Sequence, residues 1–163
     1  MPGTNMTFPR RAGKFSVTLL LPGVLMALRA AAEPAAVVSD HHTGLAIAGY
    51  DPVAYFAEAK ATAGRSDLEL TDTRGVFRFR NQGNLAAFAA NPDVYAPQFS
   101  GYDPIALARG IALEGNPLEW EIVGDRLYLF YSPQARAAFK ENPAQAIAIA
   151  AERWQAIAPG IVP

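Results

Sequence analysis

Two adjacent histidines beside an aspartate form the most evident cluster of transition-metal ligands in the sequence: Asp40, His41 and His42. Imidazole and carboxylate groups bind divalent zinc and copper, so a flexible segment could close these side chains around one ion. In an extended strand, successive side chains point to opposite faces, which would separate the two imidazoles. The cluster is therefore interpreted either as a divalent metal site or as a solvated pair in a linker. Tight copper(I) capture is disfavoured, because the chain has no cysteine and no methionine beyond Met26.

Two aspartates, Asp51 and Asp103, stand in the same local sequence, Gly-Tyr-Asp-Pro, at positions 52 residues apart. A pair of carboxylates can serve as general acid and general base. An aspartate directly before proline is also typical of a helix N-cap followed by the first helical residue, and such a cap is worth about 1 kcal/mol. The capping interpretation is favoured, and the acid–base interpretation stays open.

The irregular segment 95–103 concentrates aromatic rings, an amide and a carboxylate between the two motifs. Because it joins two similar halves, it is a natural place for a ligand-binding cleft. The alternative is that its aromatic rings only fill the core between the halves. The candidate ligand-binding residues are Tyr50, Asp51, Tyr95, Gln98, Phe99, Tyr102 and Asp103.

The elements that would position these residues are predicted to occur as two copies of one unit. Each copy has a short helix that starts at an Asp-Pro pair, then a β-hairpin, then a helix that ends before an Asn-Pro pair. The predicted short helices are 52–59 and 104–109, the hairpins are 68–79 and 120–130, and the second helices follow Asn81 and Ser132. Landmarks repeat at offsets of 51 and 52 residues, which favours an internal duplication.

The fold class predicted from this pattern is α+β. A single two-stranded hairpin is at best marginally stable, so the two hairpins are expected to form one small, four-stranded antiparallel sheet packed with the helices. A last amphipathic helix, 144–157, is expected to cover the core. The predicted organisation is an extended arm over 33–43, the domain over 44–157 and a tail over 158–163.

Residues 1–32 are predicted to be an export signal. Basic residues Arg10, Arg11 and Lys14 precede the apolar run 15–28, and small residues at 30–32 follow it. The arginine pair leaves twin-arginine and general export as alternatives. An uncleaved membrane anchor is a further alternative, although the run is short for a membrane span. The predicted location is therefore periplasmic or exported, with membrane contact only through an uncleaved signal.

Composition excludes several classes of function. The absence of cysteine excludes disulfides, thiolate metal sites and cysteine nucleophiles. Loss of the signal would remove four of the 14 basic residues and none of the 15 acidic ones, which leaves a net charge of −5 and no electrostatic footprint for nucleic acid. No histidine falls within 44–157, and Ser100 lacks the glycine two positions earlier that a nucleophile elbow needs. Enzymatic activity is therefore the least favoured class.

Several of these segments together resemble exported bacterial YHS-domain proteins. The similarity is carried by 44–56, which includes Gly-Tyr-Asp-Pro-Val-Ala-Tyr-Phe, by 77–79 with 87–99, and by 127–131. The resemblance covers nearly the whole chain after the predicted signal and implies a small α+β module. YHS domains occur beside copper and heavy-metal transport proteins and are often linked to metal binding through cysteines.

The departures from that family matter for function. Where many relatives carry cysteine after Gly-Tyr, this chain has Asp103, and the positions after the strand hold Arg80, Asn81 and Leu85. A thiolate metal site therefore does not carry over. The favoured hypothesis is an exported, non-enzymatic binding module for a small ligand or a periplasmic partner protein, with no cofactor evident. The alternative is a periplasmic metal-handling protein that uses His and Asp ligands for a divalent ion.

Overall fold

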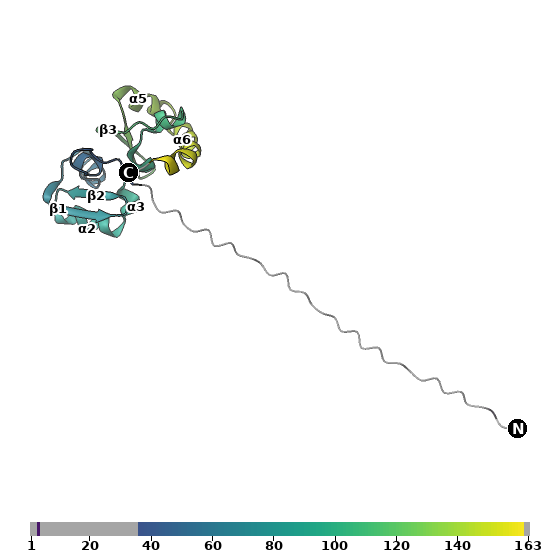
Figure 1. Ribbon diagram of the computed structural model, residues 1–163, viewed down its shortest axis with the longest axis horizontal. Coiled ribbons are helices and arrows are strands. Elements are labelled where there is room, and N and C mark those ends of the chain that lie inside the picture. Colours follow the sequence, from purple (N-terminus) through teal and green to yellow (C-terminus); the bar gives the residue numbers. More distant parts are fainter. Residues whose placement is uncertain (1–2, 4–35, 162–163) are drawn as a thin grey trace. The chain divides into compact units, whose positions relative to one another are not determined.

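The computed structural model describes residue 3 and residues 36–161, so the predicted export signal lies outside the described residues. Residues 32–163 form one compact unit, separate from residues 1–31. In the first half of this unit, a 3₁₀ turn η1 (Ile47–Gly49) leads to α1 (Ala54–Ala57), then to β1 (Arg65–Asp72), β2 (Gly75–Phe79), α2 (Gln82–Ala90) and α3 (Pro92–Tyr95). Figure 1 shows the β1–β2 hairpin beside α2 and α3.

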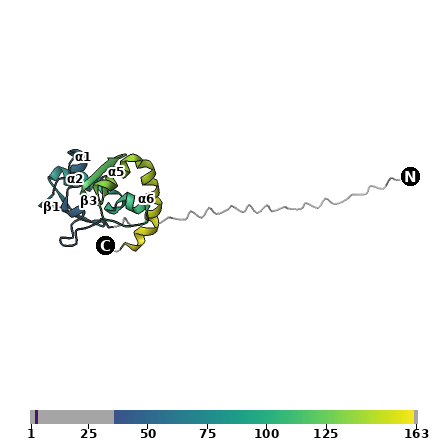
Figure 2. The same cartoon turned by 90° about the horizontal axis from the view of Figure 1, so that it is seen from above.

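The second half repeats this order. Turn η2 (Gln98–Gly101) leads to α4 (Pro104–Ala108), β3 (Asn116–Val123), β4 (Arg126–Phe130), α5 (Pro133–Glu141) and α6 (Pro143–Ile157), and the turn η3 (Ala158–Gly160) follows. The predicted α+β class is confirmed, and the repeated order of elements agrees with the predicted repeat. The copies differ mainly after the Asn-Pro pair, where the first continues as the four-residue α3 and the second as the fifteen-residue α6. Figure 2 shows α6 as the long helix at the edge of the domain.

Side-chain caps set the helix starts, as the sequence predicted. Asn81 accepts the Asn84 backbone N–H at 2.8 Å, and Ser132 accepts the Ala135 backbone N–H at 3.2 Å. Both are N-cap residues in extended conformation, so their side chains satisfy a donor that the first helical turn leaves free. The two helices therefore start at equivalent positions in the two halves.

The hairpins form two separate two-stranded sheets, so the predicted four-stranded sheet is wrong. The edge of β2 that does not pair with β1 is occupied by the segment before η1. There the Ala46 backbone N–H donates to the Val76 carbonyl at 2.9 Å, and Leu45 forms a parallel β-bridge with Val76. Turn η2 packs against β4 in the second hairpin. These contacts with irregular segments take the place of strand-to-strand pairing between the hairpins.

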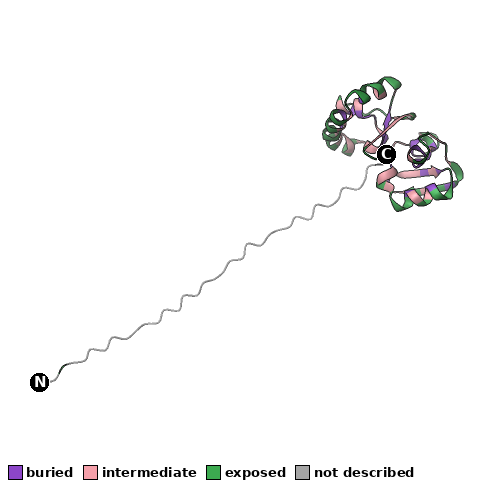
Figure 3. Ribbon diagram, turned by 180° about the vertical axis from the view of Figure 1, so that it is seen from behind, coloured by how far each residue is buried: buried purple, intermediate pink, exposed green. Residues whose placement is uncertain are grey.

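Aromatic side chains hold each hairpin to its helix in the same way. In the first half, the Phe88 ring lies 4.6 Å from Phe77 and 5.3 Å from Phe79, centroid to centroid. In the second half, the Phe139 ring lies 5.3 Å from Tyr128 and 4.9 Å from Phe130. All six positions correspond at an offset of 51 residues and are buried. Figure 3 marks the buried residues of the strands and helices in purple.

The strand β4 joins the two halves because both of its faces are buried. Leu127 and Leu129 pack into the main core with Phe77 and Phe88, whereas Tyr128 and Phe130 pack on the other face, toward α5 and α6. Alternate residues of a strand point to opposite faces, so a strand with two buried faces carries an almost continuous apolar run. Residues 36–43 of the predicted arm also contribute to this core: Val37 is buried, and its N–H donates to the Arg74 carbonyl at 2.8 Å.

Tyr55 links the two hairpin units, and its removal should lower stability. Its buried hydroxyl donates to the Pro117 carbonyl oxygen at 3.0 Å, and its ring meets Trp120 edge to face at 5.3 Å. We expect Tyr55→Phe to lower the free energy of unfolding at neutral pH by about 1 kcal/mol, because one buried hydrogen bond is lost. The exposed Tyr131 is the matched control, since Tyr131→Phe should leave urea unfolding unchanged.

The same variant should change the pH dependence of stability. Burial, followed by the charges of Tyr50 and Asp51, raises the pKa of Tyr55 above its usual value of 10.0. The contribution of the protonated Tyr55 phenol to stability is complete below about pH 10. It is lost as pH rises further, because the phenol ionises in the unfolded chain before it ionises in the folded protein. Between pH 9 and pH 11, the free energy of unfolding measured in urea should therefore fall less in Tyr55→Phe than in the parent protein. Parallel curves for the two proteins would contradict this explanation.

Candidate functional site

The two Asp-Pro aspartates occupy equivalent places in the two halves and do not form one site. Both carboxyl groups are almost fully buried, with Asp51 0% and Asp103 1% exposed. One oxygen of Asp51 accepts the N–H groups of Val53 at 2.8 Å and Ala54 at 3.3 Å. Asp51 therefore caps the turn that leads into α1, as the sequence favoured, although α1 itself begins at Ala54 rather than at the predicted Pro52.

The other oxygen of Asp51 ties the start of α1 to the end of the hairpin. It accepts the Arg80 backbone N–H at 2.8 Å and the Asn84 side-chain N–H at 2.7 Å. The Asp51 carboxylate therefore accepts from four donors in total, and the Asn84 side chain that provides one of them is itself buried. A carboxylate offers about four acceptor positions, so the hydrogen-bonding capacity of Asp51 is used within the protein.

Asp103 repeats three of these four bonds. One oxygen accepts the N–H groups of Ile105 at 2.7 Å and Ala106 at 3.3 Å, and the other accepts the Tyr131 N–H at 2.9 Å. The fourth donor is missing, because Ala135 stands where the first half has Asn84. The methyl group of Ala135 cannot donate a hydrogen bond, so Asp103 keeps an acceptor position that Asp51 has filled.

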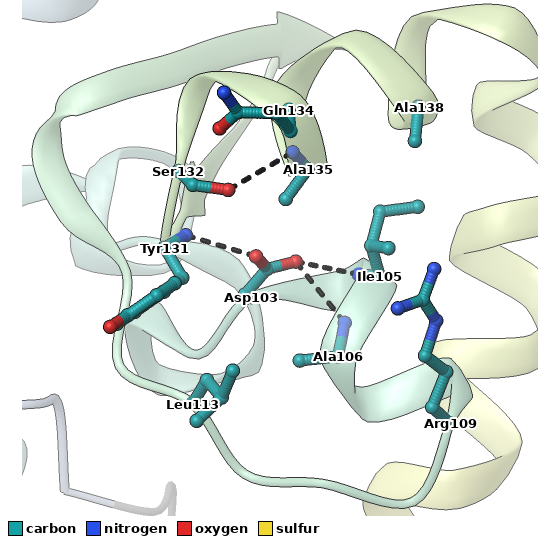
Figure 4. Close-up of a pocket in the computed structure, with 10 residues that line it drawn as sticks. All are labelled: Asp103, Ile105, Ala106, Arg109, Leu113, Tyr131, Ser132, Gln134, Ala135 and Ala138. Carbon is teal, nitrogen blue, oxygen red and sulfur yellow. Dashed lines mark hydrogen bonds between the residues drawn. The ribbon is translucent and has the colours of Figure 1, made fainter.

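A cavity of about 260 Å³ lies at this position, and Asp103, Ser132 and Ala135 all line it. Figure 4 shows the Asp103 carboxylate at the start of α4, with the small side chains of Ala135 and Ala138 on the opposite wall. Ile105 and Leu113 supply apolar surface. A polar hydrogen-bonding group surrounded by aliphatic side chains is the usual composition of a small-molecule site.

Arg109 adds positive charge to the same cavity. It is exposed, it lies just after α4, and Figure 4 shows its guanidinium group extending along the cavity toward Ala138. Within the part of the chain that the structure describes, no ion pair involves Arg109, whereas Arg74, Arg80 and Arg136 each pair with carboxylates. The cavity therefore carries one buried carboxylate and one guanidinium group that is available to a ligand.

The other predicted ligand-binding residues are distributed over several surroundings. Tyr50 packs on the main core, and Tyr95 meets Phe56 edge to face at 5.3 Å. Gln98 and Phe99 line a smaller cavity of about 210 Å³. Phe99 and Tyr102 both contact Trp154, at 6.1 Å and 5.8 Å between ring centroids. The rings of Tyr95, Phe99 and Tyr102 thus pack against other aromatic side chains, Tyr102 also lines a cavity with Asp40 and His41, and only Asp103 of this segment lines the Asp103 cavity.

The predicted metal ligands do not converge on one point. Asp40 caps a turn, where one oxygen accepts the backbone N–H of His42 at 3.1 Å and of Thr43 at 2.8 Å. The Thr43 hydroxyl, as the largest cause, holds the pKa of Asp40 below its usual value of 3.8. His41 is exposed, with Nε2 3.6 Å from a Glu114 oxygen. Over residues 36–161, no group of three His, Cys, Asp or Glu side chains has the spacing of a metal site.

Sequence reasoning missed Arg109, Tyr131 and Ala135. Ala135 could have been found by aligning the two repeats, because the offset of 51 residues that matches Phe88 with Phe139 also matches Asn84 with Ala135. A buried polar residue in one copy and alanine in the other is a signal for an unfilled position. Arg109 has no such signal, because it falls in a loop where the two copies diverge.

Comparisons of the chain with protein-family models, with curated proteins and with solved structures find no match. None of the helices in the described part of the chain is long and apolar enough to cross a membrane.

Proposed function

We propose that this protein is an exported, non-enzymatic binding module that holds a small ligand in the Asp103 cavity. The observation that carries the proposal is the difference between the two halves: Asn84 fills the fourth acceptor position of Asp51, and Ala135 leaves that of Asp103 to a ligand. The ligand is expected to donate an N–H or O–H group to Asp103. Export is supported by the signal-like residues 1–32, and the resemblance to exported YHS-domain proteins supports the same assignment.

The cavity is suited to binding rather than to catalysis. Asp103 is held by three backbone N–H groups, and the cavity is lined by no histidine, lysine or cysteine that could act beside it as a base or nucleophile. The surrounding side chains position a ligand through hydrogen bonds and apolar contact. The chemistry that this arrangement supports is selective, reversible binding.

The test is to fill the cavity with the side chain that the first half uses. We expect Ala135→Asn to donate its amide to Asp103 as Asn84 does to Asp51, which should raise the free energy of unfolding by about 1 kcal/mol. The same variant should abolish ligand binding. The matched control is Ala137→Asn, an exposed position on the same helix that does not line the cavity.

Binding is measured on the purified full chain by amide chemical-shift perturbation. The probes are a panel of small primary amines, amino acids, carboxamides and alcohols with about ten non-hydrogen atoms or fewer. Supporting results are shifts centred on Ile105, Tyr131 and Ala135 that disappear in Ala135→Asn and persist in Ala137→Asn. The proposal is overturned if no probe shifts these amides, or if the Ala135→Asn variant responds as the parent protein does.

A further inference from the structure

The Asp103 cavity has a neighbour with which it shares part of its wall. Three residues, Ile105, Arg109 and Ala138, line both the Asp103 cavity and a neighbouring cavity of about 340 Å³ between α4 and α6. The second cavity adds the aliphatic side chains of Ala146 and Ile149. Ile149 is 37% exposed. A ligand that covers it would remove apolar surface from water.

The two cavities present different chemical groups. Asp103, a hydrogen-bond acceptor with negative charge, lines the first cavity, and Arg109 lines both. The second cavity combines the aliphatic side chains of Ala146 and Ile149 with the polar ones of Glu141, Asn142 and Gln145. A simple amine would meet the charge of Arg109 unfavourably, and a simple carboxylate would meet that of Asp103. A zwitterion satisfies both, because its ammonium and carboxylate groups can each face the opposite charge.

We infer that the ligand is a free α-amino acid with an aliphatic side chain. Its ammonium group would donate to Asp103 at the position that Asn84 takes at Asp51, its carboxylate would pair with Arg109, and its side chain would lie against Ile149. Glu141, which also lines the second cavity, disfavours the reverse orientation because it would repel a carboxylate there. This inference rests on the proposed function and specifies the class of its ligand.

The experiment compares four probes that differ by one group each, by titration of the full chain in the amide spectrum. Leucine carries all three groups, glycine lacks the aliphatic side chain, leucinamide lacks the carboxylate, and 4-methylpentanoate lacks the ammonium group. Leucine should bind at least about tenfold more tightly than each of the other three, because a desolvated charge-assisted contact or a buried leucine side chain is worth at least that factor. Leucinamide also distinguishes a free amino acid from a peptide N-terminus, because a peptide would tolerate the lost carboxylate.

Arg109→Gln gives a readout that a merely structural role for Arg109 would not produce. The variant should bind leucine about tenfold more weakly and bind leucinamide no more weakly than the parent protein does, because leucine pairs with the guanidinium group whereas the cationic leucinamide is repelled by it. Arg153→Gln is the matched control, since Arg153 is also an exposed arginine and lines neither cavity. Equal loss for both probes, or leucinamide binding as tightly as leucine, would overturn the inference.

The two proposals fail in different ways. If leucine does not bind but another probe of the amine, amide and alcohol panel shifts Ile105, Tyr131 and Ala135, the amino-acid inference is wrong and the binding site stands. If leucine binds and Ala135→Asn does not weaken it, both the site and the inference are wrong. If leucine binding is lost in Ala135→Asn and kept in Ala137→Asn, both are supported.

Discussion

Asp51→Ala should destabilise the protein by about 3–5 kcal/mol, more than the same change at Asp103. The carboxylate of Asp51 is 0% exposed and accepts four hydrogen bonds. Its removal leaves the Arg80 backbone N–H and the buried Asn84 amide without their acceptor, and each such loss costs about 1–3 kcal/mol. The start of α1 loses its capping side chain in addition.

The comparison with Asp103→Ala makes the prediction specific. Asp103 accepts three hydrogen bonds and borders a cavity that is large enough for water, so water can replace part of what the carboxylate provides. We expect a loss of about 1–2 kcal/mol for Asp103→Ala, measured by urea unfolding with both variants at neutral pH. Equal losses at the two positions would show that the difference between the halves has no energetic consequence, and would weaken the case for the cavity.

Gly64→Ala should be the most disruptive change of a single methyl group in the domain. A Cβ atom at position 64 would lie 2.4 Å from the Cβ and 2.5 Å from the carbonyl carbon of Arg78. The second of these atoms belongs to the backbone of β2, so no side-chain rotation can relieve the overlap. The Gly64 N–H also donates to the Gly49 carbonyl at 2.9 Å, which fixes the segment in place. We expect a loss of about 3 kcal/mol or more in the free energy of unfolding.

The control for this change is Gly160→Ala, where a Cβ atom would meet nothing within 4 Å. Thermal and urea unfolding of Gly160→Ala should match the parent protein within error. Gly115→Ala tests the duplication, because its Cβ would lie 2.4 Å from the Leu129 Cβ and 2.7 Å from the Gly101 carbonyl oxygen. A mild effect at both Gly64 and Gly115 would contradict the close backbone approach described here.

Local chemistry made much of the fold predictable. The predicted strand segments 76–79 and 127–130 agree with β2 and β4 to within one residue, because alternation and a tight turn are encoded over a few positions. The first strand of each hairpin is longer than predicted, since β1 begins at Arg65 and β3 at Asn116. The strand register is irregular after both of these residues. The added segments show no hydrophobic alternation in the sequence, and only their backbone pairing with Phe79 and Phe130 identifies them as strand.

The separation of the two sheets was not predictable from the hairpins alone. Whether two hairpins pair edge to edge depends on what else reaches those edges, and here Leu45 and Ala46 occupy the edge of β2. The backbone conformation of η1 and η2 was equally unpredictable from the sequence. The non-glycine residues Ile47, Ala48, Phe99 and Ser100 adopt φ values of 46–54° there. Side chains of this kind seldom adopt positive φ, so only the surrounding contacts determine it.

The sequence by itself determined the repeated unit, the helix caps at Asp51, Asp103, Asn81 and Ser132, and the turns of the hairpins, because each depends on neighbours within a few residues. Only the tertiary structure decided that the two aspartates differ. Asp51 is closed by Asn84, 33 residues later, whereas Asp103 faces Ala135 and a cavity that Arg109 also lines. A cavity exists only where side chains from distant elements fail to fill the space between them, and no local pattern encodes that failure.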